Sequence, residues 1–378
     1  MSYFSATKLV DEAGVPYGVK QVENKPRVSS MPYLYDIGEG NIAGHVAWSK
    51  IGYIIMPATV ESDVWSYGAT TNIVPIMTAG ATRRIVTANA ADAGAVIKGD
   101  ATGDTITSDA GGSTTTLVDA DVDFLAATAV AIGDCVILDP HGAVAEWGFV
   151  TGVATNTLIL ANGFSQGGTG SLRKYAVVDY SPQVGCHAVL INYLDSNYAT
   201  KKEIVVTNGN QANGVVTIGS DIFRVNSFRV IATGSAGKPT GDIKLGDNAT
   251  PPTIIYAYIT AGFTRSRGSL YTVPADKTLY LTSWTMSYAA AVDNRTTSCR
   301  FYTRAAQFTA EDITYRTNVA PGVMIWYPYA EVVVSNSVAV VGFDVPIKIL
   351  PKVSVKVSGS GASIATGIAT SVLRGWLE

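Results

Sequence analysis

The chain has 378 residues, of which 47% are hydrophobic and 15% are charged. A charged share well below the roughly 25% of an average soluble domain excludes an intrinsically disordered chain and requires that much apolar surface be buried. The formal net charge of −3 gives no general electrostatic reason to bind nucleic acid or an anionic membrane, so we expect neither as a partner.

The first 30 residues follow neither a helical nor a strand period and are interrupted by glycine and proline. We interpret residues 1–30 as an extended arm without a core of its own. No apolar run precedes Lys8 and Asp11, and no run in the chain approaches the roughly 18 apolar residues of a membrane span. We therefore expect synthesis and folding in a cytoplasm, with no secretion signal and no membrane-spanning segment.

Short apolar runs in residues 31–100 and 176–260 have the spacing of sheet strands, and neither stretch looks complete alone. In the first stretch, Val46, Trp48 and Ile51 fit one strand of a packed sheet. We therefore expect the two stretches to form a single β-sandwich, with residues 101–175 inserted into one of its loops.

The inserted stretch is acidic. Residues 91–172 hold ten acidic residues and one basic residue, Lys98, a net −9 that leaves +6 on the rest of the chain. Five short apolar runs bounded by turn residues predict a small antiparallel barrel: TTTLVD, GDCVILDP, EWGFVTGV, NTLILANGF and RKYAVVD. A separate acidic unit should have its ends close together, and its replacement by a short linker should leave the rest of the chain folded.

Residues 261–378 contain seven or eight further strand-like runs, which is the size of a jelly-roll-like sandwich. In TLYLTSW, strict alternation places Leu279 and Leu281 on one face and Tyr280 and Trp284 on the other. The predicted fold class is therefore all-β: an N-terminal extended arm, a β-sandwich with an inserted small β-barrel, and a C-terminal jelly-roll-like sandwich.

Two motifs match catalytic or metal-binding letters without the context that the chemistry requires. Residues 163–167 match G-x-S-x-G, but no helix-forming sequence follows them and no later histidine completes a triad. Asp119, Asp121 and Asp123 alternate as at the start of a calcium-binding loop, but the turn glycine and the bidentate glutamate of that loop are missing. A glycine-rich loop and a solvated acidic turn are favoured.

Asp139, His141 and Glu146 could form an acid–base set across a predicted hairpin, although a surface hairpin without chemistry is favoured. The cysteines are too far apart in sequence to support a disulfide framework or a zinc site: Cys135, Cys186 and Cys299. We therefore predict no catalytic residue, no metal site, no cofactor and no enzymatic activity.

An aromatic cluster in the last domain could stack on sugar rings or on a receptor, although packing in a sandwich core is favoured. Its members are Tyr315, Trp326, Tyr327 and Tyr329.

The segment from residue 17 to residue 53 combines aromatic side chains with prolines that restrict the free chain, a combination suited to lie extended on a partner. The predicted docking residues are Tyr17, Arg27, Tyr33, Tyr35, Trp48, Lys50 and Tyr53. Trp48 and the pair Tyr33 and Tyr35 are the expected buried anchors. The alternative is that residues 42–58 complete the first sandwich as a core strand.

Several segments resemble structural proteins of tailed bacteriophages: NKPRVSSMPYLYDIGEGN (24–41), INYLDSNY (191–198), FRVNSFRV (223–230) and YTVPADKTLYLTSW (271–284). The commoner phage form of the last segment has Gly where Asp276 stands. The insert, with LVDADVDF and VAIGDCVILD, is similar to a small β-barrel module that recurs in phage particle proteins. These segments carry no catalytic residue, so the resemblance implies a virion component without indicating which part of the particle.

The resemblance implies a protein that docks on the capsid, neck or tail through its N-terminal segment, projects its β-domains and contacts other virion proteins. Low charge and exposed strand edges predict a homo-oligomer, and phage decorations and fibres in general favour a trimer. The alternative function is an adhesin that binds host-surface carbohydrate. A depolymerase would require paired carboxylates on a β-helix repeat, and the sequence has no such period.

Overall fold

The computed structural model describes residues 21–22, 25–26, 37–38, 40, 42–56, 62–67, 73–101, 107–109, 111–126, 128–142, 144–161, 164, 173–181, 183–290, 299–307, 327–334, 337–361 and 367–378. Strands hold 54% of the described residues and helices hold 1%, which confirms the all-β fold class. Within this part of the chain, no helix is long and apolar enough to cross a membrane.

The chain divides into two units, Met1–Ala47 and Trp48–Glu378. In the first unit, β1 (Gln21–Val22) and β2 (Lys25–Pro26) pair antiparallel. The other residues of the predicted arm lie outside the described residues.

The second unit contains the acidic insert, which forms a six-stranded antiparallel sheet in the order β6-β12-β8-β10-β11-β7. Its strands are β6 (Val96–Gly99), β7 (Thr116–Val118), β8 (Cys135–Leu138), β10 (Glu146–Ala154), β11 (Thr157–Leu160) and β12 (Tyr175–Val178). Each of the five predicted runs forms one of these strands. The sheet also takes in β6, which precedes the expected boundary at residue 101, because β6 pairs with β12.

Two four-stranded sheets enclose one apolar core and together form a middle sandwich. The first sheet contains β16 (Arg224–Thr233), β13 (Cys186–Leu194), β14 (Thr200–Val206) and β9 (His141–Gly142). The second contains β15 (Val215–Val216), β5 (Arg84–Thr87), β17 (Ile243–Gly246) and β18 (Ile255–Ile259). Of the described residues between 31 and 100, only those of β5 join this sandwich as a strand.

The insert is not independent of the middle sandwich, because β8 serves two cores. Val136 and Leu138 pack into the insert's own core, while Cys135 and Ile137 face a second core shared with Leu190 and other residues of the middle sandwich. Strand β9, which belongs to the insert by sequence, also pairs with β14. The alternation of side chains along a strand thus joins the two parts through one element.

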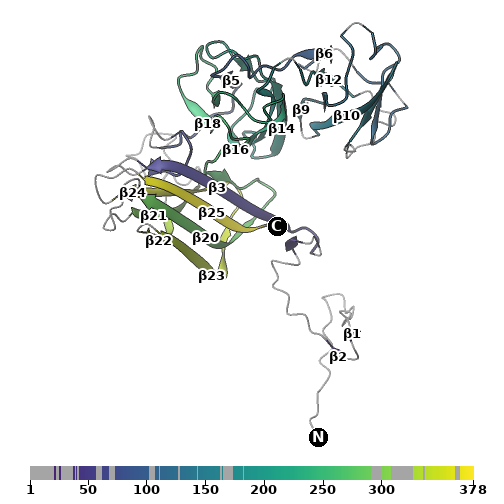
Figure 1. Ribbon diagram of the computed structural model, residues 1–378. Helices are drawn as coiled ribbons and strands as arrows, with labels where there is room; N and C mark the ends of the chain where they lie inside the picture. Colours follow the sequence, from purple (N-terminus) through teal and green to yellow (C-terminus); the bar gives the residue numbers. More distant parts are fainter. Residues whose placement is uncertain are drawn as a thin grey trace. The chain divides into compact units, whose positions relative to one another are not determined.

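The C-terminal sandwich contains a sheet in the order β23-β20-β25-β3 and a sheet in the order β19-β24-β21-β22, with β4 paired to β24 (Figure 1). The first sheet comprises β23 (Ser337–Ile349), β20 (Leu279–Ala290), β25 (Gly367–Leu377) and β3 (Val46–Met56). The second comprises β19 (Tyr271–Thr272), β24 (Val353–Gly361), β21 (Cys299–Gln307), β22 (Tyr327–Val334) and β4 (Ser62–Asp63).

Strands β3 and β4 correct the expected domain assignment of residues 31–100. Both belong to the C-terminal sandwich, where Ile54 and Val64 are fully buried in the same core as Trp284. The buried carboxylate of Asp63 pairs at 2.7 Å with the buried ammonium of Lys356 on β24. The burial of Ile54 and Val64 and the buried ion pair together explain why β3 and β4 pack with strands far away in sequence.

A bulge in β20 corrects the predicted faces of TLYLTSW. The register of β20 shifts between Leu281 and Ser283 against both neighbouring strands. The extra residue reverses the alternation that follows it, so Trp284 faces inward with Leu279 and Leu281 and is fully buried. Trp284 also donates a hydrogen bond from Nε1 to Ser371 Oγ at 3.1 Å.

The shared strand β8 gives a testable consequence. Ile137→Ala should lower the free energy of unfolding by about 2–5 kcal/mol and reduce hydrogen-exchange protection of amides in β13 and β14. Val136→Ala, its neighbour on the opposite face, should reduce protection within the insert and leave β13 and β14 protected. Equal loss of protection in β13 for both variants would contradict the assignment of Ile137 to the shared core.

Candidate functional site

Three predicted docking residues lie on β3 and have partners within the chain. The ring of Trp48 packs 4.9 Å from the ring of Tyr271, and the Arg267 guanidinium lies 5.5 Å from the centre of the Tyr53 ring. Lys50 donates a hydrogen bond from its ammonium group to the main-chain oxygen of Asn226. These contacts account for the aromatic character of residues 46–56, which complete the C-terminal sandwich rather than the first one.

The remaining predicted site residues lie outside the described part of the chain or have side chains that do. Tyr17, Arg27, Tyr33, Tyr35, Tyr315 and Trp326 lie outside the described residues. Tyr327 and Tyr329 belong to β22, but their side chains are not described.

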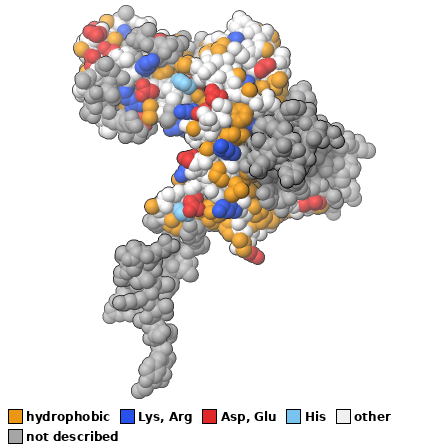
Figure 2. All heavy atoms as spheres, turned by 180° about the vertical axis from the view of Figure 1, so that it is seen from behind, with side chains coloured by type: hydrophobic (Ala, Val, Ile, Leu, Met, Phe, Trp, Pro, Cys, Tyr) orange, Lys and Arg blue, Asp and Glu red, His pale blue; other side chains and the backbone are white. Residues whose placement is uncertain are grey.

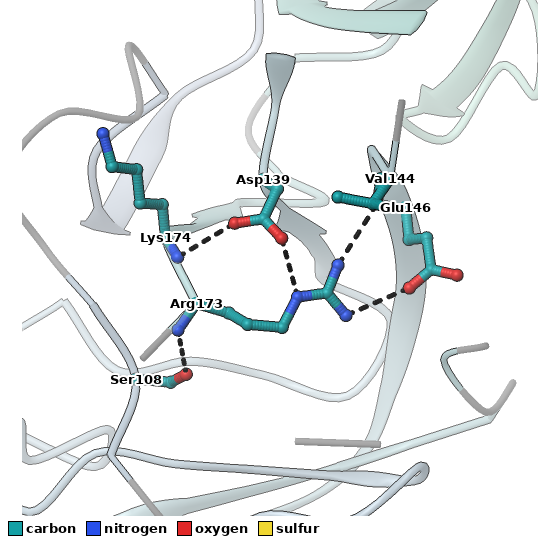
Figure 3. A network of polar contacts seen from close by, with 6 residues as sticks. All are labelled: Ser108, Asp139, Val144, Glu146, Arg173 and Lys174. Carbon is teal, nitrogen blue, oxygen red and sulfur yellow. Dashed lines mark hydrogen bonds and ion pairs between the residues drawn. The ribbon is translucent and has the colours of Figure 1, made fainter. Parts of the chain in front are cut away.

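The members of the candidate acid–base set lie in two different contacts, of which Figure 3 shows the one that involves Asp139 and Glu146. Asp139 and Glu146 both pair with the buried guanidinium of Arg173. Its Nε lies 2.7 Å from the Asp139 carboxylate, and its Nη1 lies 3.1 Å from the Glu146 carboxylate. Asp139 has a φ of +42°, a conformation that Asp adopts more readily than most residues, and it also accepts a hydrogen bond from the main-chain N–H of Lys174. The network ties three segments of the insert together.

His141 belongs to a different contact, at the junction of the insert with the middle sandwich. Its Nδ1 lies 3.5 Å from Oε2 of Glu203, whose side chain is fully buried. The Glu203 carboxylate also accepts hydrogen bonds from the main-chain N–H groups of Ile218 and Gly219, at 2.6 and 3.0 Å. These donors satisfy the buried carboxylate and position the Glu203 side chain, so the arrangement has a structural role.

The aspartates of the calcium-like pattern take part in internal bonds. Asp119 is buried and accepts a 2.6 Å hydrogen bond from the Tyr175 hydroxyl, while Asp123 caps the main-chain N–H of Leu125. Burial, with Asp119 beside the hydroxyl, raises the pKa of Tyr175, so this donor stays protonated. Among the described residues, no group of three His, Cys, Asp or Glu side chains could hold a metal ion.

Cys135 and Cys186, the two cysteines whose side chains are described, are buried free thiols. Burial raises the pKa of the Cys135 thiol to about 12 and that of Cys186 further in the same direction. A thiol with a raised pKa is a poor nucleophile at neutral pH. These two residues therefore act as small apolar side chains in the cores.

A basic cleft lies between β3 and β16. It has a volume of about 220 Å³ and presents three cationic side chains, those of Lys50, Arg229 and Arg265. Three serines, Ser49, Ser227 and Ser266, also line it. No acidic side chain is among the described residues that line it. The arrangement can bind an anionic group through charge and hydrogen bonds together.

Sequence reasoning did not find this cleft, because its cations are 36 to 215 positions apart along the chain. A weak signal existed in the +6 charge of the chain outside the acidic stretch and in the arginines of FRVNSFRV and FTRSRGS. Only the packing of β3 beside β16 brings Lys50 to the two arginines.

The electrostatics of the cleft are set by the enclosed ammonium of Lys50. Burial lowers the pKa of Lys50 from 10.5 to about 8, and no carboxylate among the described residues opposes this effect. Lys50 also lines a smaller cavity of about 30 Å³, which is about the share of volume of one water molecule in the liquid. Trp65, whose buried Nε1 has no hydrogen-bond acceptor among the described residues, lines the same cavity.

Comparisons with known proteins identify no family. No family model and no curated protein matches the chain. Among solved structures, the chain is similar to the mosquito-larvicidal Cry4Aa toxin from Bacillus thuringiensis, at 7% sequence identity and a TM-score of 0.15. The match covers 64% of this chain and 52% of the toxin chain, so the chain spans about half of the toxin's length. A TM-score this low carries no argument about fold or function.

The lowered pKa of Lys50 predicts a pH dependence of stability. Between about pH 8 and pH 10.5 the unfolded chain holds the proton that the folded chain has lost, so this group makes the free energy of unfolding rise with pH in that window. Below about pH 8 Lys50 is charged in both states, and its contribution stays flat at its least favourable level.

Lys50→Met should remove this contribution, so denaturant unfolding at pH 7.5 and pH 10 should show a smaller rise for the variant than for the wild type. Lys348→Met, which removes an exposed lysine from β23, is the matched control and should keep the wild-type rise. Identical pH profiles for the wild type and Lys50→Met would show that Lys50 is not enclosed.

Proposed function

We propose that the chain is a structural component of a tailed-phage virion, docked through its N-terminal segment and projecting β-domains from the particle. Capsid decoration, head fibre and neck or tail protein are the positions that fit this role. The proposal is supported by the resemblance of four sequence segments to phage structural proteins and by the all-β fold. It is further supported by a sheet face in the C-terminal sandwich that carries exposed valines.

That sheet face is the observation on which the proposal depends. Trp284 and Met286 of β20 point into the core, so their neighbours Thr285 and Ser287 point outward. Across from these two outward residues, β23 places Val340 and Val338, whose side chains are 69% and 63% exposed. On the other side, β25 continues the same uncharged surface with Val372 and Thr370.

This outer face has the composition of an assembly surface. It is a row of Val, Thr and Ser side chains, and Ile368 extends it with a side chain that is 47% exposed. Strand β23 ends its sheet on the described strand path, so an edge adjoins the apolar face. Exposed apolar patches and open strand edges mark surfaces that another chain covers. Elsewhere, on the face drawn in Figure 2, charged and hydrophobic side chains are interspersed.

The N-terminal docking prediction now depends on residues before β3. Trp48, Lys50 and Tyr53 contact their own chain, so the partner-binding residues we propose are Tyr17, Arg27, Tyr33 and Tyr35. The adhesin alternative depends on the cluster around Trp326, whose side chains lie outside the described residues.

We expect the full-length chain to be a homo-oligomer at micromolar concentration, with a trimer favoured, and Val338→Lys/Val340→Lys to be a folded monomer. The charges would prevent a second chain from covering the outer face of β23. Light scattering measures the mass of each. Ile132→Lys, which alters a side chain 71% exposed on the insert, should keep the oligomer. A monomeric wild-type chain would contradict this expectation.

Deletion of residues 1–30 should leave the protein folded and abolish its incorporation into particles that lack it. Folding should persist because the strands of the C-terminal sandwich begin at residue 46. Circular dichroism checks the fold, and antibody labelling of particles in electron micrographs checks incorporation and position together. Normal incorporation of the shortened chain would refute docking through the arm, and full-length chain absent from every particle would refute the virion role.

A further inference from the structure

We propose that the basic cleft between β3 and β16 binds a phosphate or sulfate group through Lys50, Arg229 and Arg265. This inference does not rest on the virion role, because it follows from the residues of the cleft alone. It identifies an anion-binding site, which the sequence does not predict.

Two arginines of the cleft lie directly opposite each other on neighbouring strand segments. Arg229 on β16 and Arg265 form an antiparallel bridge. The flanking hydrogen bonds, from Val230 N to Thr264 O and from Ser266 N to Phe228 O, are both 2.8 Å. They make Arg229 and Arg265 a non-hydrogen-bonded pair, the kind whose side chains lie closer together.

Like charges directly opposite each other destabilise a strand pair. No acidic residue is among the described residues that line the cleft with Arg229 and Arg265. None of these lining residues therefore offsets the repulsion between the two arginines. A tetrahedral oxyanion between the two guanidinium groups would remove this repulsion and accept hydrogen bonds from both forks. Both arginines are exposed, so solvent screens part of this repulsion, and a bound anion would offset what remains.

Two of the three cations, Arg229 and Lys50, are held in place before a ligand arrives. The Arg229 guanidinium lies 5.1 Å from the centre of the Trp147 ring, a cation–π contact with the insert. Lys50 is fixed by its hydrogen bond to the Asn226 oxygen, and its ammonium is enclosed without a carboxylate among its described neighbours. A side chain that is already positioned loses less entropy when a ligand binds.

The size of the cleft limits the ligand to one anionic group. A volume of about 220 Å³ lies below the roughly 300–1,000 Å³ of pockets that enclose drug-sized ligands. It accommodates a phosphate or sulfate group with some bound water, and Ser227 and Ser266 are among the residues that line it. The anion can be a free ion or an ester carried by a sugar.

The test measures the melting temperature of the full-length chain with inorganic phosphate, sodium sulfate, glucose 6-phosphate or glucose, each at constant ionic strength against sodium chloride. We expect the three anions to raise the melting temperature of the wild type and glucose to leave it unchanged. A shift at lower concentration for glucose 6-phosphate than for phosphate would identify a sugar-borne ester as the source.

Arg265→Gln should weaken phosphate binding about tenfold or more in calorimetric titration, since a charge-assisted contact is lost. Without added anion, the same variant should melt at a higher temperature than the wild type, because the repulsion from Arg229 is gone. Arg374→Gln, which removes an exposed arginine from β25, is the matched control and should match the wild type. The proposal is overturned if no anion exceeds chloride, or if phosphate stabilises Arg265→Gln and the wild type equally.

Discussion

The side chain of Asn226 joins the middle and C-terminal sandwiches within the second unit. Its amide nitrogen donates to Thr272 O at 2.8 Å, and its amide oxygen accepts from Thr272 N at 2.9 Å. The main-chain oxygen of the same residue accepts from the Lys50 ammonium. One position on β16 therefore contacts both β19 and β3. Because the two amide bonds satisfy main-chain groups of the two-residue strand β19, the junction is specific as well as cohesive.

Buried carboxylates serve the same purpose elsewhere in the fold. Asp92 is fully buried and accepts main-chain N–H bonds from Cys186, Thr240 and Gly241, at 2.7, 2.9 and 2.6 Å. These donors lie far apart in sequence, at the start of β13 and in the turn before β17. Short strands leave many loop N–H groups unpaired, and an anionic acceptor can satisfy several at once. This explains why a chain with few charged residues buries some of them.

The local elements could be predicted from the sequence, and the pairing of distant strands could not. The runs that became β7, β8, β10, β11 and β12 were predictable because turn residues bound each of them. The pairing of β3 could not be predicted, because an apolar strand that contains Ile54 fits either sandwich. Only packing in the folded core distinguishes the two. Strict alternation failed at Leu281 because a bulge leaves no signal in the pattern of apolar residues. The basic cleft has the same origin, because Arg229 and Arg265 meet only through a bridge.

The position of Lys50 connects the cleft to the junction. Its ammonium donates to Asn226 at the junction and lines the cleft with Arg229 and Arg265. Enclosure of this charge is unfavourable, as its lowered pKa shows, and an anion in the cleft would offset that cost. Because the same proton is then held more tightly, an occupied cleft would keep the hydrogen bond to Asn226 charge-assisted at higher pH. Ligand binding and the cohesion of the two sandwiches are thereby linked through one side chain.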